Sequence, residues 1–291
     1  MGDNSKRIQN WAAFSGKKGP GFCVICGQHG DLTRDHVPPQ GCIRISNKIL
    51  SRLTMEAGSG EGQRNTKLIQ GGLKFKTLCG RCNGELLGLR FDPELKHLVD
   101  SMNTGIQEVA AIVVLPRIVR VEANLHLVAR SVIGHVLASH SVSDTMAWRE
   151  DIGASEALRH YFLHPECSFP DDWSLYCWPY FSGKQVILKH AGWMDISLAN
   201  AGEKVIYGHL LKFSPFGFWL VHKRHREFVI NALEITPEGE PDASRTPISF
   251  DLRHAPHCLY PENPSGHQMI IFANDQSSVA APVVGGTKAL K

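Results

Sequence analysis

The fold is decided by the stretch that begins FCVICG at residue 22 and ends LCGRCN at residue 83. This stretch contains two C-x2-C pairs, Cys23 with Cys26 and Cys79 with Cys82. Two such pairs supply four thiolates for a closed, tetrahedral Zn²⁺ site. Because so short a segment has too little core to hold its shape unaided, the spacing predicts a zinc-stabilised unit in the first third of the chain.

An Asp-His pair lies between the two cysteine pairs, in the run TRDHVPP (33–39), and Asn83 directly follows the last cysteine. A carboxylate oxygen suits a hard divalent ion, and an imidazole titrates near neutral pH and can accept a proton from water. Zinc bound by both pairs would draw Asp35, His36 and Asn83 together. Two structural alternatives stay open: His36 could support the zinc ligands from outside, and Asn83 could cap the helix that follows.

The order of these motifs resembles the HNH endonuclease family, in the branch that carries two cysteine pairs. The resemblance covers about residues 20–95. It implies a ββα-metal fold and metal-dependent hydrolysis of phosphodiester bonds. It also implies that His36 is the general base and that Asp35 and Asn83 bind a catalytic Mg²⁺ or Mn²⁺, separate from the structural Zn²⁺.

The chain departs from that family at two positions. Many relatives carry a second His or Asn one helical turn after the residue that matches Asn83, where this chain has Leu87. The Asn usually found before the second strand is not evident near Lys74, and Asn65 is a distant candidate. Asp92 and His97 are candidate substitutes for the missing groups.

Charge is unevenly distributed along the chain. Residues 1–96 hold 15 Lys/Arg and 8 Asp/Glu, a net charge of +7, whereas the remainder has a net charge of −4. A basic segment around the cysteines suits a phosphate backbone, so we predict DNA as the partner, with RNA not excluded. The alternative is a solvated surface loop. The predicted phosphate contacts are Arg44, Lys48, Arg52, Arg64, Lys67, Lys74 and Lys76.

The patterning predicts an α+β protein with two units. Residues 1–100 are expected to form the small zinc unit, with a helix at 43–55 from its apolar spacing. Residues 101–275 are expected to form a larger α+β unit with mainly antiparallel strands. It would contain helices at 122–140 and 154–163 and a hairpin from 204–212 and 217–223. Residues 276–291 are small and weakly patterned, and are expected to be a disordered tail.

Nothing in the sequence indicates export or membrane insertion. The first ten residues are polar, and the longest apolar run, 109–115, is too short to span a bilayer. We therefore expect a cytoplasmic protein. The remaining cysteines are interpreted as free thiols because they show no metal-ligand spacing.

These features favour an HNH-type endonuclease that hydrolyses DNA. Similarity to stand-alone bacterial and phage proteins would suggest a role in restriction, antiviral (anti-phage) defence or a mobile element. One alternative is a non-catalytic zinc-ribbon module that binds nucleic acid. Another is an effector-gated assembly protein with a silent nuclease unit. In either case residues 101–275 would supply specificity, form a homodimer, or bind a regulatory ligand or protein partner.

Overall fold

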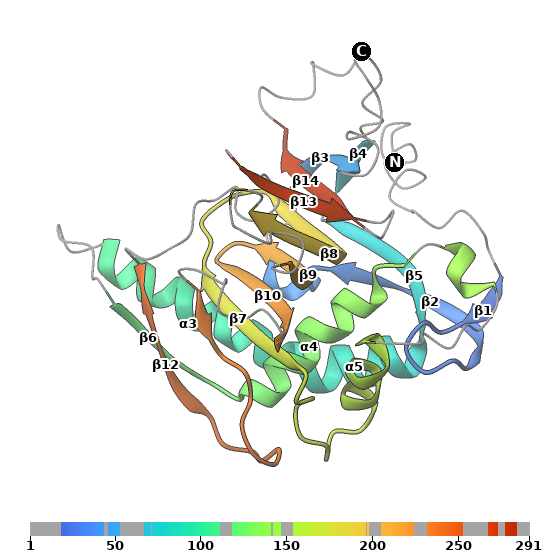
Figure 1. The fold of residues 1–291 in the computed structure, drawn as a ribbon, viewed down its shortest axis with the longest axis horizontal. Helices are drawn as coiled ribbons and strands as arrows, with labels where there is room; N and C mark the ends of the chain where they lie inside the picture. The colour runs from blue at the N-terminus through green and yellow to red at the C-terminus, as the bar shows by residue number, and fades with distance from the viewer. Residues whose placement is uncertain are drawn as a thin grey trace.

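The computed structural model describes residues 19–43, 46–52, 67–70, 72–110, 118–140, 142–146, 154–195, 197, 205–223, 232–252, 267–272 and 277–283. The fold is mixed α+β, with few helices, and every strand pairing in the described part is antiparallel (Figure 1). The coarse prediction of an α+β protein with mainly antiparallel strands is therefore confirmed.

The smaller sheet has the strand order β1-β2-β5. Its strands are β1 (Pro20–Phe22), β2 (His29–Val37) and β5 (Leu73–Cys79). In β5, Leu73 and Phe75 are buried while Lys74 and Lys76 are partly exposed, as an alternating strand requires. Helix η2 (Arg81–Phe91) follows with π-type hydrogen bonds, and α3 (Asp92–Ala110) continues from it without a break.

The larger sheet has the order β11-β7-β10-β9-β8-β14-β3-β4, and β13 also pairs with β8. Its strands are β3 (Asn47–Arg52), β4 (Lys67–Gln70), β7 (Trp173–Pro179), β8 (Gln185–Asp195), β9 (Ile206–Phe213), β10 (Phe216–His222), β11 (Leu233–Glu234), β13 (Gln268–Phe272) and β14 (Ser278–Pro282). Strands β6 (Ile118–Ala123) and β12 (Thr246–Asp251) form a separate pair beside α3.

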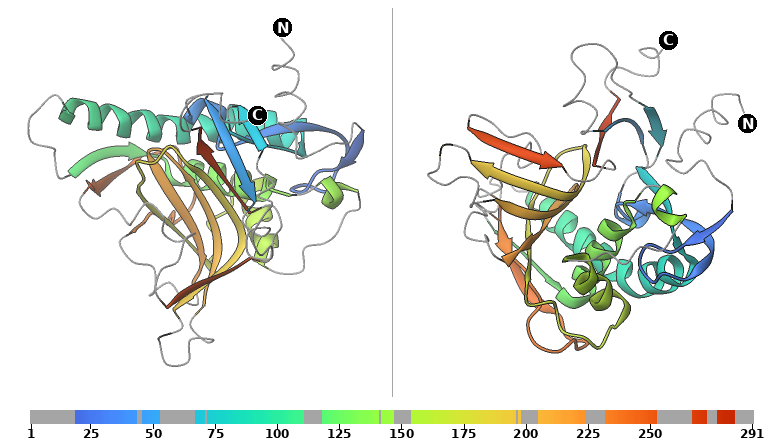
Figure 2. Two further views of the ribbon diagram at one scale, coloured as in Figure 1. Left: turned by 90° about the horizontal axis from the view of Figure 1, so that it is seen from above. Right: turned by 45° about the vertical axis from the view of Figure 1, so that its right-hand side comes forward.

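Helix α4 (Leu125–Ala138) lies between the smaller sheet and the larger sheet (Figures 1 and 2). It contacts β2 and β5 of the smaller sheet and β8 and β9 of the larger one. It begins after Asn124, whose side-chain oxygen accepts a hydrogen bond from the Leu127 amide at 3.1 Å. Nearly all of its residues are buried, and α5 (Ala154–Leu163) packs against it. The short helices η1 (Gln40–Cys42) and η3 (Val142–Thr145) complete the described elements.

The helices predicted at 122–140 and 154–163 are confirmed by α4 and α5, and the predicted hairpin is formed by β9 and β10. The helix predicted at 43–55 is wrong, because residues 47–52 form strand β3. That strand is paired on one edge with β4 and on the other with β14. Pairing on both edges satisfies its backbone, and this tertiary context overrides the local helical spacing.

Two further predictions about chain organisation need correction. The boundary expected after residue 100 falls inside α3, and one hydrophobic core joins Phe75 and Leu87 of the first unit to Phe162 and Phe213 of the second. Residues 278–282, expected to lie in a disordered tail, form β14 in the larger sheet, paired with β3 and β8. Residues 284–291 lie outside the described part.

Gly134 allows α4 to pack closely against its neighbours. A Cβ at this position would lie 2.4 Å from Phe162 Cε2 and 2.6 Å from Leu87 Cδ2. We expect Gly134→Ala to lower the free energy of unfolding by about 1–3 kcal/mol through overpacking. The control is Gly84→Ala at an exposed position of η2, where a Cβ would meet nothing within 4 Å, and it should raise the free energy of unfolding by up to about 1 kcal/mol. Urea unfolding of both variants measures the difference, and equal midpoints would contradict this packing.

Candidate active-site cleft and cysteine cluster

The four cysteines of the two C-x2-C pairs form one cluster. Their sulfur atoms all lie within 4.8 Å of one another, and the Cys26 and Cys79 sulfurs are 3.7 Å apart. Zn–S bonds of about 2.3 Å in a tetrahedron place the sulfurs about 3.8 Å apart. The donor set and its spacing therefore fit a Zn²⁺ ion.

Local structure explains how each cysteine reaches the cluster. Cys23 and Cys26 lie in the turn between β1 and β2, where the Gly27 amide donates to the Cys23 carbonyl at 2.9 Å and Gly27 takes a φ of 72°. Cys79 ends β5, and Cys82 lies in the first turn of η2. Hydrogen bonds among the thiols lower the pKa of Cys23 and raise the pKa values of Cys26 and Cys82, so the Cys23 sulfur is the most readily ionised of the three. A bound Zn²⁺ ion would take the cysteines as thiolates and release their protons.

A cleft of about 370 Å³ lies beside this cluster, between β2, η2 and the start of α3. Asp35 and His36 reach it from β2, and Asn83 reaches it from η2. The three residues predicted to act together thus line one cavity. The side chains that line it and carry charge or an amide are Arg34, Asp35, His36, Gln40, Asn83, Asp92 and Lys96.

Asp35 is almost completely buried and is held by a histidine that the sequence reading did not identify. Its Oδ2 atom accepts a hydrogen bond from His135 Nδ1 of α4 at 2.9 Å. The other ring nitrogen of His135, Nε2, lies 3.0 Å from Asp92 Oδ1, which also accepts from Ser131 Oγ at 2.7 Å. Asp92, a candidate substitute in the sequence, therefore contacts His135 and lines the cleft.

The electrostatics of this chain of groups follow from burial and charge. Burial alone would lower the pKa of His135, but the two carboxylates raise it to about 10, so the ring is protonated and donates to both. Burial raises the pKa of Asp35, although the charge and hydrogen bond of His135 act in the opposite direction. A protonated His135 is unsuited to accept a proton from water.

The pKa of His36 is shifted in the opposite direction to that of His135. His36 is half-buried, and its pKa is lowered by burial first and then by the positive charges of Lys74 and His135. The imidazole is therefore neutral at neutral pH and available as a proton acceptor. Lys74 lies directly across the β2–β5 ladder from His36. His36 lines the cleft and can serve as a base, whereas protonated His135 lies behind Asp35 and cannot.

Asn83 ties η2 to β2. Its Nδ2 atom donates to Thr33 Oγ1 at 2.9 Å and to the Arg34 carbonyl at 3.0 Å. These two bonds use both amide hydrogens, which leaves the carbonyl oxygen to act as an acceptor or ligand. The alternative role as a helix cap is not seen, because Gly80 occupies the N-cap position of η2.

The predicted phosphate contacts divide into three groups. Lys74 and Lys76 are partly exposed on β5, and Lys74 lies beside His36. Lys48 is buried and its Nζ donates to the Gly183 carbonyl at 2.7 Å, which contradicts its predicted phosphate contact. The other predicted contacts fall on residues or side chains outside the described part: Arg44, Arg52, Arg64 and Lys67. Asn65 lies there too.

Two basic residues in the cleft were missed in the sequence. Arg34 is exposed, and Lys96 of α3 is half-exposed and paired with Asp100. Arg34 directly precedes Asp35 in the sequence, which is a weak indication that its side chain lies near the cleft. Lys96 comes from a helix 60 residues later, and only the fold brings it to the cleft. His97, the other candidate substitute, does not line the cleft.

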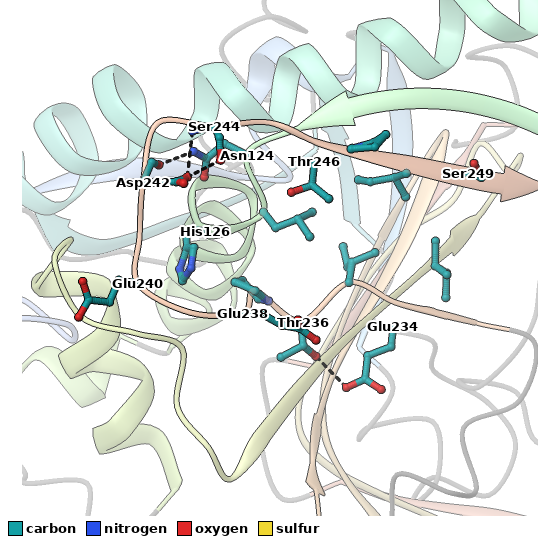
Figure 3. Close-up of a pocket in the computed structure, with 16 residues that line it drawn as sticks. Asn124, His126, Glu234, Thr236, Glu238, Glu240, Asp242, Ser244, Thr246 and Ser249 are labelled. Carbon is teal, nitrogen blue, oxygen red and sulfur yellow. Dashed lines mark hydrogen bonds between the residues drawn. The ribbon is translucent and has the colours of Figure 1, made fainter.

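A second pocket, of about 550 Å³, lies at the start of α4 around His126 (Figure 3). It is larger than the cleft, but four carboxylates line it and none of its described lining residues is Lys or Arg. The carboxylates belong to Glu234, Glu238, Glu240 and Asp242. A surface of this charge would repel nucleic-acid phosphates, so the Asp35–His36 cleft is the better candidate for a phosphodiester substrate.

In comparisons with known proteins, no protein-family model, curated protein or solved structure matches the chain. Within the described residues, no helix has the length and apolar content needed to cross a membrane. The cysteine cluster and the cleft are the features of the molecule that bear on its function.

Proposed function

We propose that the protein is a metal-dependent HNH-type endonuclease that hydrolyses DNA phosphodiester bonds at this cleft. The observation that carries the proposal is that Asp35, His36 and Asn83 meet in one cavity beside the cysteine cluster. These are the residues that resemble the family's motif, and they come from segments almost 50 positions apart. Asp35 and His36 lie on β2, and the antiparallel neighbour β5 leads into η2, which carries Asn83; this arrangement supports a ββα-metal unit.

Each cleft residue then has a role in the reaction. Neutral His36 would take a proton from the attacking water. Asp35 and Asn83 would offer oxygen ligands to a Mg²⁺ or Mn²⁺ ion, which when bound would neutralise charge on the phosphate and on the leaving oxygen. Arg34, Lys74 and Lys96 would attract the phosphate backbone. By resemblance to the family, the products would carry 5′-phosphate and 3′-hydroxyl ends.

The experiment is incubation of the zinc-loaded protein with supercoiled plasmid in Mg²⁺, in Mn²⁺ or in EDTA. We expect nicked or linear DNA with either ion and intact plasmid in EDTA, because Asp35 and Asn83 need the ion to act on phosphate. A single-stranded RNA substrate run in parallel decides between DNA and RNA. Intact plasmid and intact RNA under every condition would reject the proposal.

A second candidate is a nucleic-acid-binding zinc module without nuclease activity. It is favoured by the scarcity of ligands, since the described residues hold no group of three His, Cys, Asp or Glu besides the cysteines that is close enough to share an ion. Such a protein would bind DNA with a steep salt dependence. Binding that is unchanged between Mg²⁺ and EDTA, with no cleavage in either, would select this candidate.

Gating by an effector remains a prediction. His126 of this pocket and His135, which contacts the cleft residues Asp35 and Asp92, lie on the same helix about two and a half turns apart. A cytoplasmic location, a homodimer and a role in anti-phage defence, restriction or a mobile element likewise remain predictions.

A further inference from the structure

We propose that His135 is a positioning residue that fixes Asp35 so that one carboxylate oxygen faces the cleft. This inference rests on the proposed function and assigns a role to a helix outside the segment that resembles the nuclease family. The observations that carry it are the two hydrogen bonds of the His135 ring and the burial of the groups involved.

Hydrogen bonds occupy both nitrogens of His135. Nδ1 contacts Asp35 Oδ2 at 2.9 Å and Nε2 contacts Asp92 Oδ1 at 3.0 Å. The His135 side chain is 1% exposed and that of Asp35 is 5% exposed. With both nitrogens used and the ring almost completely buried, His135 is available neither as a metal ligand nor as a base. Its contribution is the orientation of the carboxylates.

Asp92, at the other end of this chain of hydrogen bonds, is also bound by a second residue of α4. Ser131 lies one helical turn before His135 on α4, and its hydroxyl donates to the same Asp92 oxygen at 2.7 Å. Asp92 is therefore held by two groups of α4 and in turn holds Nε2 of His135. This fixes the ring, and the ring fixes Asp35. Groups that orient a ligand in this way commonly change metal affinity by about 10–100-fold when removed.

The consequence at the cleft concerns the number of ligand atoms that Asp35 can offer. Oδ2 accepts from His135, and the His36 backbone amide also donates to this carboxylate, so Oδ1 is the oxygen that His135 does not bind and that we assign to a cation. Mg²⁺ is commonly bound through one or two carboxylates, with waters and substrate phosphates as the other ligands. A single well-oriented oxygen from Asp35, with the Asn83 carbonyl, suits that mode of binding. The nuclease cleft is thereby completed by α4, outside residues 20–95.

The test measures Mn²⁺ binding to the zinc-loaded full-length protein by electron paramagnetic resonance, together with plasmid cleavage, zinc content and melting temperature. His135→Leu would remove the ring donor from buried Asp35 and leave Asp92 with Ser131 alone, so the variants are the polar His135→Gln and Asp92→Asn. The matched control is His160→Gln, an exposed histidine on α5. Asp35→Asn identifies the Mn²⁺ signal that belongs to the cleft.

We expect His135→Gln to remain folded with full zinc, to bind Mn²⁺ about 10–100-fold more weakly, and to lose kcat with little change in KM for DNA. Asp92→Asn should show a smaller loss in the same direction, and His160→Gln none. Folded His135→Gln and Asp92→Asn proteins with wild-type Mn²⁺ affinity and kcat would overturn the positioning role while leaving the nuclease intact. A wild-type protein with neither an Asp35-dependent Mn²⁺ signal nor cleavage would overturn the proposed function and this inference together.

Discussion

Replacing His36 by alanine is expected to reduce plasmid cleavage by about 10²-fold or more, because a positioned general base commonly contributes about 10²–10⁴ in rate. His36 is the neutral histidine of the cleft, and protonated His135 cannot substitute for it. The half-buried side chain lines the cleft, so alanine removes it from a cavity wall. Melting temperature and zinc content should therefore stay close to wild type.

The matched control is His29→Ala, which removes an exposed histidine from the same strand β2, outside the cleft. It should cleave at the wild-type rate. Initial rates of nicking in Mg²⁺ compare the two variants under identical conditions. Full activity in a purified, zinc-loaded His36→Ala protein would contradict the proposed role of His36 as the general base, whichever metal supports cleavage.

Replacing Cys79 by serine is expected to act on folding rather than on chemistry. Zinc binding supplies about 10–16 kcal/mol to small structural sites, so losing even a fifth of it would cost about 2–3 kcal/mol. For a chain of this size that corresponds to a fall of roughly 4–12 °C in melting temperature. The affected region is the junction of β5 and η2, where Cys79 and Cys82 lie.

The control for this substitution is Cys167→Ser, a partly exposed cysteine outside the cluster, which should melt as the wild type does. Bound zinc is measured by release to a chromogenic chelator beside each melting curve. The structural assignment would be contradicted by a Cys79→Ser protein that retains wild-type zinc content and melting temperature. Loss of cleavage should accompany unfolding of this region.

The parts of the site that could be predicted are those with a local chemical signature. Two cysteines separated by two residues can share an ion, and an ion with four sulfur ligands joins two distant segments whatever the intervening sequence does. This is why the approach of Asp35 and Asn83 to one cleft followed from the sequence. Helix α4 could also be predicted from the sequence, because its apolar periodicity runs over several turns.

His135 could not be predicted in the same way. It lies on a helix whose other residues are largely apolar and buried, and this pattern predicts a core position for the histidine and not a role beside the cleft. Its partners lie 100 and 43 residues away along the chain, so no local spacing connects them. Strand β3 was missed for a related reason, since its structure depends on β4 and β14 rather than on its own spacing.

The most direct test of the central claim is a crystal of the zinc-loaded protein soaked in Mn²⁺, with anomalous diffraction collected above the absorption edges of both metals. The account predicts zinc among Cys23, Cys26, Cys79 and Cys82, and manganese in the cleft within coordination distance of Asp35 Oδ1 and the Asn83 carbonyl oxygen. A cleft without manganese, at a concentration that supports cleavage in solution, would contradict it.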